Sequence, residues 1–434
     1  MKKCLLILIA IMLVCLCSCS ISDYLPLNDT PKTAETLNPY MEVVPDELTY
    51  SEGYEPVTSS YSYDALPLEG EKLLYTEMLG VCYDISSELD EELERYAMPQ
   101  VELKGYSLSE AQVRTACKAL TDDHPEIFWL TGTMGFYSGD DATVIQIYSK
   151  YCPEEIDTRV NAVRSRANEF YATVPDGLSE FDRQVKVHDY LIEHVAYDDS
   201  VDMNNIDSNN PDIYTVYGAL VDGTAVCEGY ARAFQMLMNG LGVDCVGLMG
   251  SSQNQMHMWN AAKIDGTWYQ TDVTWDDQEE PYEQHVYCNV SDAFMYDDHT
   301  LSPLFSALAD EEINGEEGDY SASVMNIYVP VCPDGVRSYY AVRAPRLTDF
   351  DGAEVKSGLL ACAEKQEEYF VFYIDEGLDY TGAVTQLFSE YPQYFFDYVR
   401  TVNDYLTDYS IDATNASYFT HEKSRIVAVE LHYY

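Results

Sequence analysis

The chain has 434 residues, with 24 Lys and Arg against 75 Asp and Glu, so its formal net charge is −51. This charge argues against a nucleic-acid groove or a polybasic lipid-binding surface, because both need a dense basic patch to meet phosphate groups. The hydrophobic fraction of 47% argues against wholesale disorder, because it can supply packed cores. The length exceeds that of one ordinary core, so we expect two or three domains.

The N-terminus has the pattern of an export signal. Lys2 and Lys3 form a charged start, and the apolar run 5–14 has signal-peptide length but is too short to span a bilayer comfortably. We expect residues 1–18 to be removed, which changes the formal charge from −51 to −53 through the loss of the two lysines. The mature chain is therefore expected to be extracytoplasmic.

The signal ends in Leu16-Cys17-Ser18-Cys19, which resembles a bacterial lipobox. Cys19 follows a small residue and is the expected lipidation site, whereas Cys17 follows a bulky leucine. A diacylglyceryl group carries two acyl chains, which is enough for a stable anchor to the cell membrane. An ordinary secretory signal with incidental cysteines is the alternative.

The rest of the chain divides into four expected segments. Residues 19–66 are rich in Pro, Ser, Thr, Asp and Glu without a sustained period, and we interpret them as a tether. Residues 67–155 and 321–434 mix helical and strand patterns and are expected to form two smaller α+β units. Residues 156–312, between them, are expected to form the catalytic domain.

Spacing predicts several elements in these segments. Apolar residues three or four apart predict helices from Glu71 to about Leu93, from Ser109 to a stop at His124-Pro125, over 153–171, and from Ser179 to His194. Alternating apolar residues predict a strand over 143–148.

One pattern occurs near both ends of the chain. Residues 123–129 and 390–396 each place a proline between a helix and paired strands, and an apolar extended segment lies about 20 residues earlier in each case. Duplication of one α+β unit explains the pattern, and so does chance.

The central segment carries the residues that could perform chemistry. Residues 223–234 predict a loop that turns into a helix, with Cys227 in its first turn and one apolar face directed into the fold. A helix N-terminus stabilises a thiolate, which is the reactive form of cysteine. A small buried core residue is the alternative reading of Cys227.

A hairpin follows this helix. Residues 255–262 predict one strand, Asp265-Gly266 predicts a two-residue turn, and residues 268–275 predict the returning strand. Pairing about this turn makes His257 and Asp272 diagonal neighbours on adjacent strands. A helix-terminal Cys, a strand His and a nearby Asp form the pattern of nucleophile, base and orienting group.

These motifs resemble the transglutaminase-like superfamily over about residues 181–298. The matching runs are Gly223–Gly229, Met256-His257-Met258-Trp259-Asn260 and Ile264–Asp277. The resemblance implies a papain-like α+β fold, with a helix packed on an antiparallel sheet. It also implies that Cys227 is the nucleophile, His257 the general base and acid, and Asp272 the group that orients the histidine.

The implied activity is acyl transfer from a protein or cell-wall peptide amide through a thioester on Cys227. Cross-linking, deamidation and proteolysis all remain open, and a non-catalytic surface binding or scaffold lipoprotein is the alternative function. The backbone N–H of Cys227 is a natural oxyanion donor, and Tyr217 or Trp259 could supply the second. No cofactor is expected, and neither HExxH nor CxxC spacing occurs, so no metal site is expected. The signal segment, the lipidation site Cys19 and the nucleophile Cys227 account for five of the 12 cysteines. The number that remains is odd, so a framework that pairs all of them in disulfides is excluded.

Overall fold

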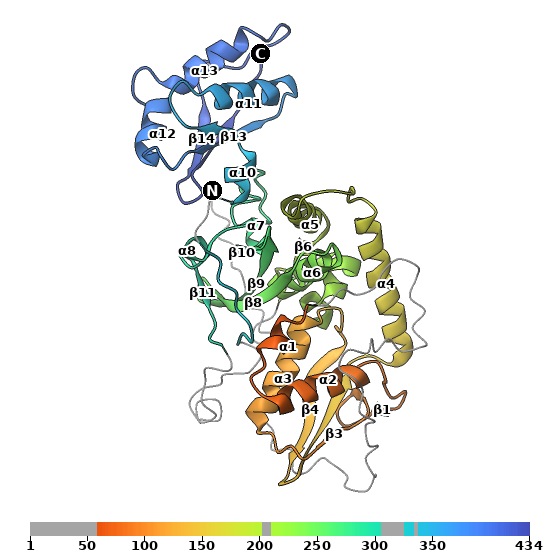
Figure 1. The fold of residues 1–434 in the computed structure, drawn as a ribbon. Helices are drawn as coiled ribbons and strands as arrows, with labels where there is room; N and C mark the ends of the chain where they lie inside the picture. Colours follow the sequence, from red (N-terminus) through yellow and green to blue (C-terminus); the bar gives the residue numbers. More distant parts are fainter. Residues whose placement is uncertain (1–58, 202–209, 305–324, 334–336) are drawn as a thin grey trace. The chain divides into compact units, whose positions relative to one another are not determined.

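The computed structural model describes residues 59–201, 210–304, 325–333 and 337–434 (Figure 1). Internal contacts divide the chain into two compact units. The first contains the described residues of 1–269 and 296–332, and the second contains those of 270–295 and 333–434. The expected signal peptide and Cys19 lie outside the described residues. Within the described residues, no helix is both long and apolar enough to cross a membrane.

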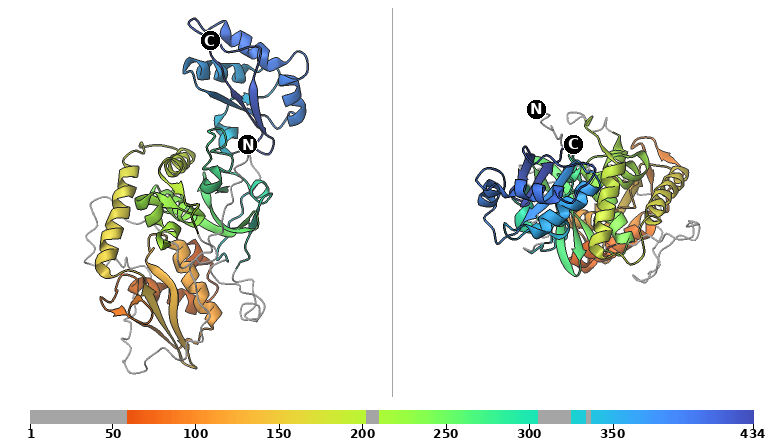
Figure 2. Two further views of the ribbon diagram at one scale, coloured as in Figure 1. Left: turned by 180° about the vertical axis from the view of Figure 1, so that it is seen from behind. Right: turned by 90° about the horizontal axis from the view of Figure 1, so that it is seen from above.

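The first unit begins with three helices and a five-stranded sheet. The helices are α1 (Tyr61–Ala65), α2 (Glu69–Val81) and α3 (Glu110–Asp123). The strands are β1 (Leu89–Asp90), β2 (Arg95–Ala97), β3 (Val101–Lys104), β4 (Leu130–Ser138) and β5 (Ala142–Ser149). Strand β5 is central because β2, β3 and β4 all pair with it in antiparallel fashion. Helix α2 packs against both α3 and β3 (Figure 2).

Two long helices and a set of short elements follow. The helices α4 (Pro153–Tyr171) and α5 (Glu180–His194) have the predicted bounds, and the Ser179 hydroxyl accepts from the N–H of Asp182 as an N-cap. The short elements are β6 (Ala196–Tyr197), η3 (Pro211–Tyr214), η4 (Gly218–Asp222) and β7 (Thr224–Ala225). They lead directly into helix α6 (Cys227–Gly240).

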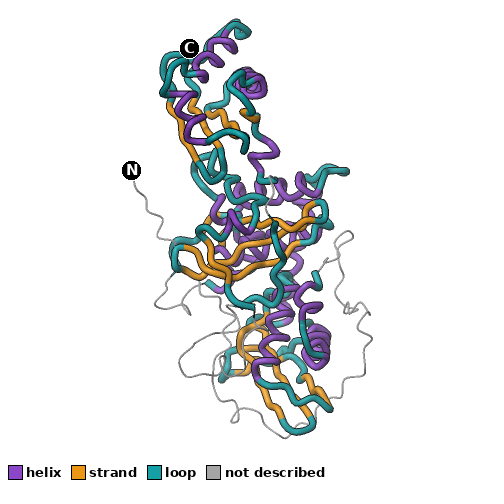
Figure 3. The backbone as a smooth tube through the Cα atoms, turned by 60° about the vertical axis from the view of Figure 1, so that its left-hand side comes forward, coloured by secondary structure: helices purple, strands orange, loops and turns teal. Residues whose placement is uncertain are grey.

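An antiparallel sheet packs against α6, and its strand order is β10-β9-β8-β11. Figure 3 draws the strands in orange and the helices in purple. The strands are β8 (Cys245–Ser252), β9 (Gln255–Ile264), β10 (Thr267–Thr271) and β11 (His299–Leu301). The turn between β9 and β10 has positive φ at both Asp265 (49°) and Gly266 (80°). That geometry is the two-residue hairpin turn that Asp-Gly predicts. A helix on an antiparallel sheet confirms the predicted α+β class.

The second unit contains the short helices α7 (Val273–Asp276), α8 (Asp292–Met295) and α10 (Tyr339–Arg343). Its longer helices are α11 (Ala353–Glu364), α12 (Tyr380–Phe388) and α13 (Tyr394–Asn403). Its sheet has the order β12-β13-β15-β14, formed by β12 (Arg346–Leu347), β13 (Tyr369–Ile374), β14 (Ser417–His421) and β15 (Ile426–Glu430). The helices and this sheet share a core that includes the fully buried Phe372 and Leu387.

The repeated sequence pattern corresponds to one shared topology. In the first unit, α2, β3 and α3 precede the β4–β5 hairpin, and β3 and β4 flank β5. In the second unit, α11, β13 and α12 precede the β14–β15 pair, and β13 and β14 flank β15. The C-terminal segment has one extra helix, α13, which begins inside its proline motif at Tyr394. The two segments share this order of elements, and duplication of one unit stays a prediction.

Two expectations about the first unit are wrong. The helix predicted from Glu71 to Leu93 ends at Val81, and Leu89 lies in strand β1. The tether predicted to reach Leu66 ends earlier, because α1 is folded onto the unit. The Asp123 carboxylate accepts hydrogen bonds from the N–H groups of Ser62 (2.9 Å) and Tyr63 (2.8 Å), which satisfies the free end of α1. This contact across sixty residues leaves no local signal in the sequence.

The eight cysteines of the described segments are all free thiols.

Candidate active site

Cys227 is the first residue of α6, and its neighbours fix the start of that helix. Its N-cap, Val226, is extended and donates its N–H to the carbonyl of Ile213 (3.0 Å). Gly229 allows the close approach, because a Cβ at that position would lie 2.5 Å from the Ile213 carbonyl oxygen. Cys227 is therefore held at a helix N-terminus and is 4% exposed, and this is a position where reactive cysteines are found in proteins.

Helix α6 is buried on every side, whereas the sequence predicts a single buried face. Glu228 and Arg232 form an ion pair of 2.8 Å inside the unit, and Arg232 also donates to the carbonyl of Thr121 (2.7 Å). Gln235 donates to the carbonyl of Asp122, at the end of α3. Burial raises the pKa of the Glu228 carboxyl. These polar side chains of α6 thus contact other residues of the same chain instead of solvent.

His257 lies in β9 and is 3% exposed. The residues on either side of Trp259 face α6: Met258 packs with Ala231, and the Asn260 amide donates to the Ala231 carbonyl (2.9 Å). Because side chains alternate along a strand, His257 and Trp259 point to the other face of the sheet. The fold attaches Cys227 and His257 to one helix–sheet assembly, because α6 packs against β9.

The hairpin pattern predicts that Asp272 lies within a strand. In the structure Asp272 lies outside the strand and directly follows the last residue of β10. It is the N-cap of α7, where its carboxylate accepts from the Trp275 N–H (3.1 Å) and its own N–H donates to Tyr287 (3.2 Å). Asp272 therefore begins a helix as its N-cap instead of continuing the strand. The Trp275 ring packs edge to face against Tyr287, with ring centroids 5.3 Å apart.

His299, at the start of β11, is a buried residue that sequence reasoning missed. Its ring centroid is 5.4 Å from that of His257 and 5.1 Å from that of Trp259. Its Nδ1 lies 2.6 Å from an Asp298 carboxylate oxygen. The adjacent Asp-His pair in the sequence has no motif spacing, so only the pairing of β11 with β8 reveals its neighbours.

The same two histidines bear on metal binding. Nitrogens of His257 and His299 lie within 4.8 Å of each other. Imidazole nitrogens are common zinc ligands. The two histidines lie on different strands, β9 and β11, so no short-range motif in the sequence indicates that they are close. The expected absence of a metal stays a prediction.

The two residues considered as second oxyanion donors have other contacts. Tyr217 lies under the guanidinium of Arg159, at 4.3 Å from the ring centroid, and packs beside Phe128. The Trp259 ring stacks near His257, with centroids 5.9 Å apart and planes 18° apart. Neither role is decided by these contacts.

Burial makes four other thiols of the described residues unreactive. Burial raises the pKa of Cys117 and Cys362 to about 12 and also raises the pKa of Cys82 and Cys245. These four thiols stay protonated at neutral pH and react slowly.

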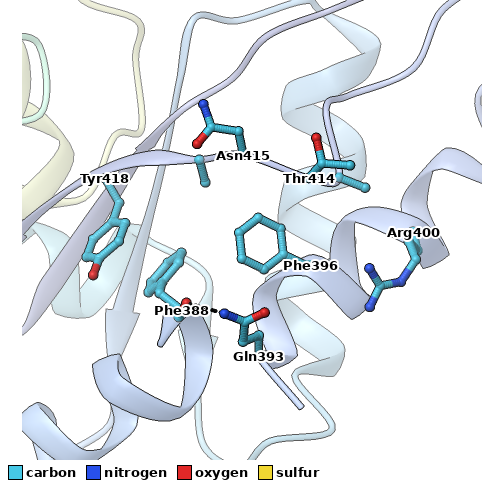
Figure 4. A pocket seen from close by; sticks show the side chains of 9 residues that line it. Phe388, Gln393, Phe396, Arg400, Thr414, Asn415 and Tyr418 are labelled. Atoms are coloured by element: carbon cyan, nitrogen blue, oxygen red, sulfur yellow. Dashed lines mark hydrogen bonds between the residues drawn. The ribbon is translucent and has the colours of Figure 1, made fainter. Parts of the chain in front are cut away.

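The second unit holds a pocket of about 420 Å³. Figure 4 shows the rings of Phe396, Phe388 and Tyr418 around it, with Arg400 at one side. The rings of Phe388 and Tyr418 stack at 4.0 Å. The remaining lining residues include the amides of Gln393 and Asn415. Stacked rings beside amide and guanidinium donors suit a ligand with an apolar face and oxygen acceptors.

Comparisons with known proteins find one matching family model, over residues 164–273. This segment matches the model of the transglutaminase-like superfamily, and it includes Cys227, His257 and Asp272. A solved TGase structure has 14% identity and a TM-score of 0.24, covering 43% of this chain and 55% of the other. A candidate cysteine protease from Cytophaga hutchinsonii has 12% identity and a TM-score of 0.21, covering 33% and 61%. The chain thus spans less than two thirds of either structure. No curated protein matches.

Proposed function

Because residues 164–273 form a domain of the transglutaminase-like superfamily, we propose that this protein is a thiol acyltransferase or hydrolase. It forms a thioester on Cys227 from the amide of a protein or of a cell-wall peptide. The observation that carries the proposal is the position of Cys227, which is the first residue of a helix inside the matched segment. A helix N-terminus lowers the free energy of the thiolate that must attack.

In the proposed reaction, the Cys227 thiolate attacks the amide carbonyl, and a C–S bond forms. His257 donates a proton to the leaving nitrogen as the C–N bond breaks, which releases ammonia or an amine. A second amine or water then attacks the thioester, His257 accepts the proton from this nucleophile, and the thiolate is regenerated. The N–H of Cys227 stabilises the oxyanion of each tetrahedral intermediate.

Asp272 is the proposed orienting group for His257. It directly follows β10, and β10 is the neighbour of β9 in the sheet. A carboxylate that accepts from one imidazole nitrogen fixes the tautomer and stabilises the imidazolium form.

The proposed site of action is the outer face of the cell membrane, with Cys19 lipidated. The acidic chain favours amine acceptors with positive charge, such as lysine-rich segments, because opposite charges raise the encounter rate. We propose no nucleic-acid partner.

The proposal is tested by incubating the full chain with a glutamine-donor peptide and a labelled primary amine. The wild type is expected to release ammonia, and either to incorporate the amine or to produce the acid. Cys227→Ala is expected to lose both products. Turnover that survives Cys227→Ala would overturn the assignment of the nucleophile.

The second candidate function, binding without catalysis, is favoured by the pocket of the second unit. The Tyr418 ring, which is backed by the buried Phe388, offers a partly exposed apolar surface for a saccharide, and Arg400, which also pairs with Asp397, lies at the side of the pocket. Binding of cell-wall glycan that is lost in Phe396→Ala, in a chain without turnover, would support this function over the first.

A further inference from the structure

Two buried histidines share one face of the sheet formed by β8, β9 and β11. His257 in β9 pairs with Gly250 in β8, and Gly250 pairs with Leu301 in β11. His299 lies two residues before Leu301, so it points to the same face as Leu301 and His257. The two histidines are therefore diagonal neighbours across β8.

Gly250 makes this meeting possible. A Cβ at Gly250 would lie 2.6 Å from the Trp259 ring, so that ring occupies the space above β8 where another side chain would stand. The rings of His257, Trp259 and His299 then form one cluster with centroid separations of 5.1 to 5.9 Å. The ring plane of His257 is nearly parallel to Trp259 and inclined at 52° to His299.

His299 has the features of an oriented imidazole. Its side chain is fully buried, and its Nδ1–H donates to the Asp298 carboxylate at 2.6 Å. A hydrogen bond at one ring nitrogen fixes the plane and the tautomer of the ring, and leaves the other nitrogen as an acceptor in the neutral form. The Ser252 hydroxyl donates to the Asp298 carbonyl (2.9 Å), which ties this residue to β8.

From this geometry we propose that His299, oriented by Asp298, is a positioning residue that holds the His257 imidazole in its reactive orientation. The inference rests on the proposed function, because it concerns the base of that reaction. A base that must serve both the thiol and the leaving nitrogen needs a restricted ring plane, and a loose ring loses rate without losing substrate affinity.

The main test is His299→Phe in the full chain. Phenylalanine keeps an aromatic ring in the cluster but removes both nitrogens. We expect kcat for the glutamine-donor substrate to fall roughly tenfold to a hundredfold with KM unchanged. We expect His299→Gln, which keeps a polar group in place of the ring nitrogens, to recover part of that loss. His194→Phe, at an exposed histidine of α5, is the control and should leave kcat unchanged.

Asp298→Asn provides a second, gentler variant, because its side chain is partly exposed and the substitution keeps its shape. Its kcat should fall in the same direction as that of His299→Phe. Full activity in both variants would overturn the inference, because packing alone would then explain the cluster. A wild type with no turnover and no selective alkylation of Cys227 would instead overturn the proposed function, so the two failures are distinguishable.

Discussion

At the scale of single residues, Gly250 determines how the candidate base is surrounded. It pairs directly with His257, and it leaves open the space that the Trp259 ring fills. An added methyl group would also lie 2.2 Å from the backbone oxygen of Thr300, in the neighbouring strand β11. A flexible side chain could move away from such a group, but the backbone of a paired strand cannot move without loss of pairing.

We therefore expect Gly250→Ala to reduce the free energy of unfolding by roughly 1–3 kcal/mol, the usual cost of overpacking. We also expect lower turnover, because Trp259 is displaced beside His257. Chemical denaturation and kcat measure the two effects. Gly139→Ala is the control, since its new Cβ meets only the exposed side chain of Tyr137, and it should change stability by less than about 0.5 kcal/mol. A tolerated Gly250→Ala would contradict the described packing.

At the scale of elements, helix α6 meets the end of α3 through polar side chains, because Arg232 and Gln235 donate to the carbonyls of Thr121 and Asp122. Glu228 and Arg232 are each about 7% exposed in their side chains, and Lys118 and Asp122 form a second buried pair on α3. Burial lowers the pKa of the Lys118 ammonium and raises that of the Glu228 carboxyl. Removing one member of such a pair leaves an uncompensated buried charge.

We expect Glu228→Gln to cost about 3–5 kcal/mol of unfolding free energy, because Arg232 would lose its buried counter-charge. The matched control is Glu169→Gln in α4, whose partner Arg166 lies 3.0 Å away in a half-exposed pair. The control should cost less than about 1 kcal/mol. Thermal and denaturant unfolding measure both variants. Equal effects would show that burial of the first pair has no energetic consequence.

The contact between α1 and α3 makes stability depend on pH. Burial raises the pKa of Asp123 to about 6 from its ordinary value of 3.8, against the hydrogen bonds from Ser62 and Tyr63 that lower it. The folded state therefore holds the proton more tightly than the unfolded state. This contribution to stability is complete below about pH 4 and is lost as the pH rises to about 6.

The direction of this change in stability with pH can be checked by comparing the wild type with Asp123→Asn between about pH 4 and about pH 6. We expect the stability of the wild type relative to the variant to fall by at most about 3 kcal/mol between about pH 4 and about pH 6. Guanidinium unfolding at each pH measures the difference. A constant difference, or one that grows with pH, would contradict a raised pKa at Asp123.

At the scale of the whole molecule, the sequence predicts a tethered extracytoplasmic protein. We expect Cys19→Ala to retain its signal segment and to lose lipid labelling in the native host, whereas Cys17→Ala should behave as the wild type. Metabolic labelling with a fatty acid and mass measurement of the mature N-terminus test this. Cleavage and lipidation that survive Cys19→Ala would show that the anchor is elsewhere or absent.

Sequence reasoning predicted the elements that depend on local patterns. The helix over 153–171, the Ser179 cap and the Asp265-Gly266 turn follow from short-range spacing, and the structure has each of them. The sequence does not predict features that depend on contacts between residues far apart in the chain. The strand predicted through Trp275 ends before Asp272 because that side chain caps α7, and α1 exists because Asp123 caps it from sixty residues away.

The candidate site shows the same division. The start of α6 at Cys227 follows from the sequence pattern, as does the strand that holds His257. The meeting of His257 with His299 does not, because it depends on β11 pairing with β8 across a long connection. The complete burial of α6 could not be predicted either, since its charged residues satisfy one another and the neighbouring α3.

The central claim, that Cys227 is a nucleophile activated by His257, is tested most directly by mapping alkylation with limiting iodoacetamide at about pH 6, where ordinary thiols are protonated. Cys152 is the internal control, because it also stands at a helix N-terminus and is more exposed than Cys227. We predict that Cys227 is alkylated first in the wild type and loses this advantage in His257→Ala. Equal or faster labelling of Cys152, or an advantage of Cys227 that persists in His257→Ala, would contradict the claim.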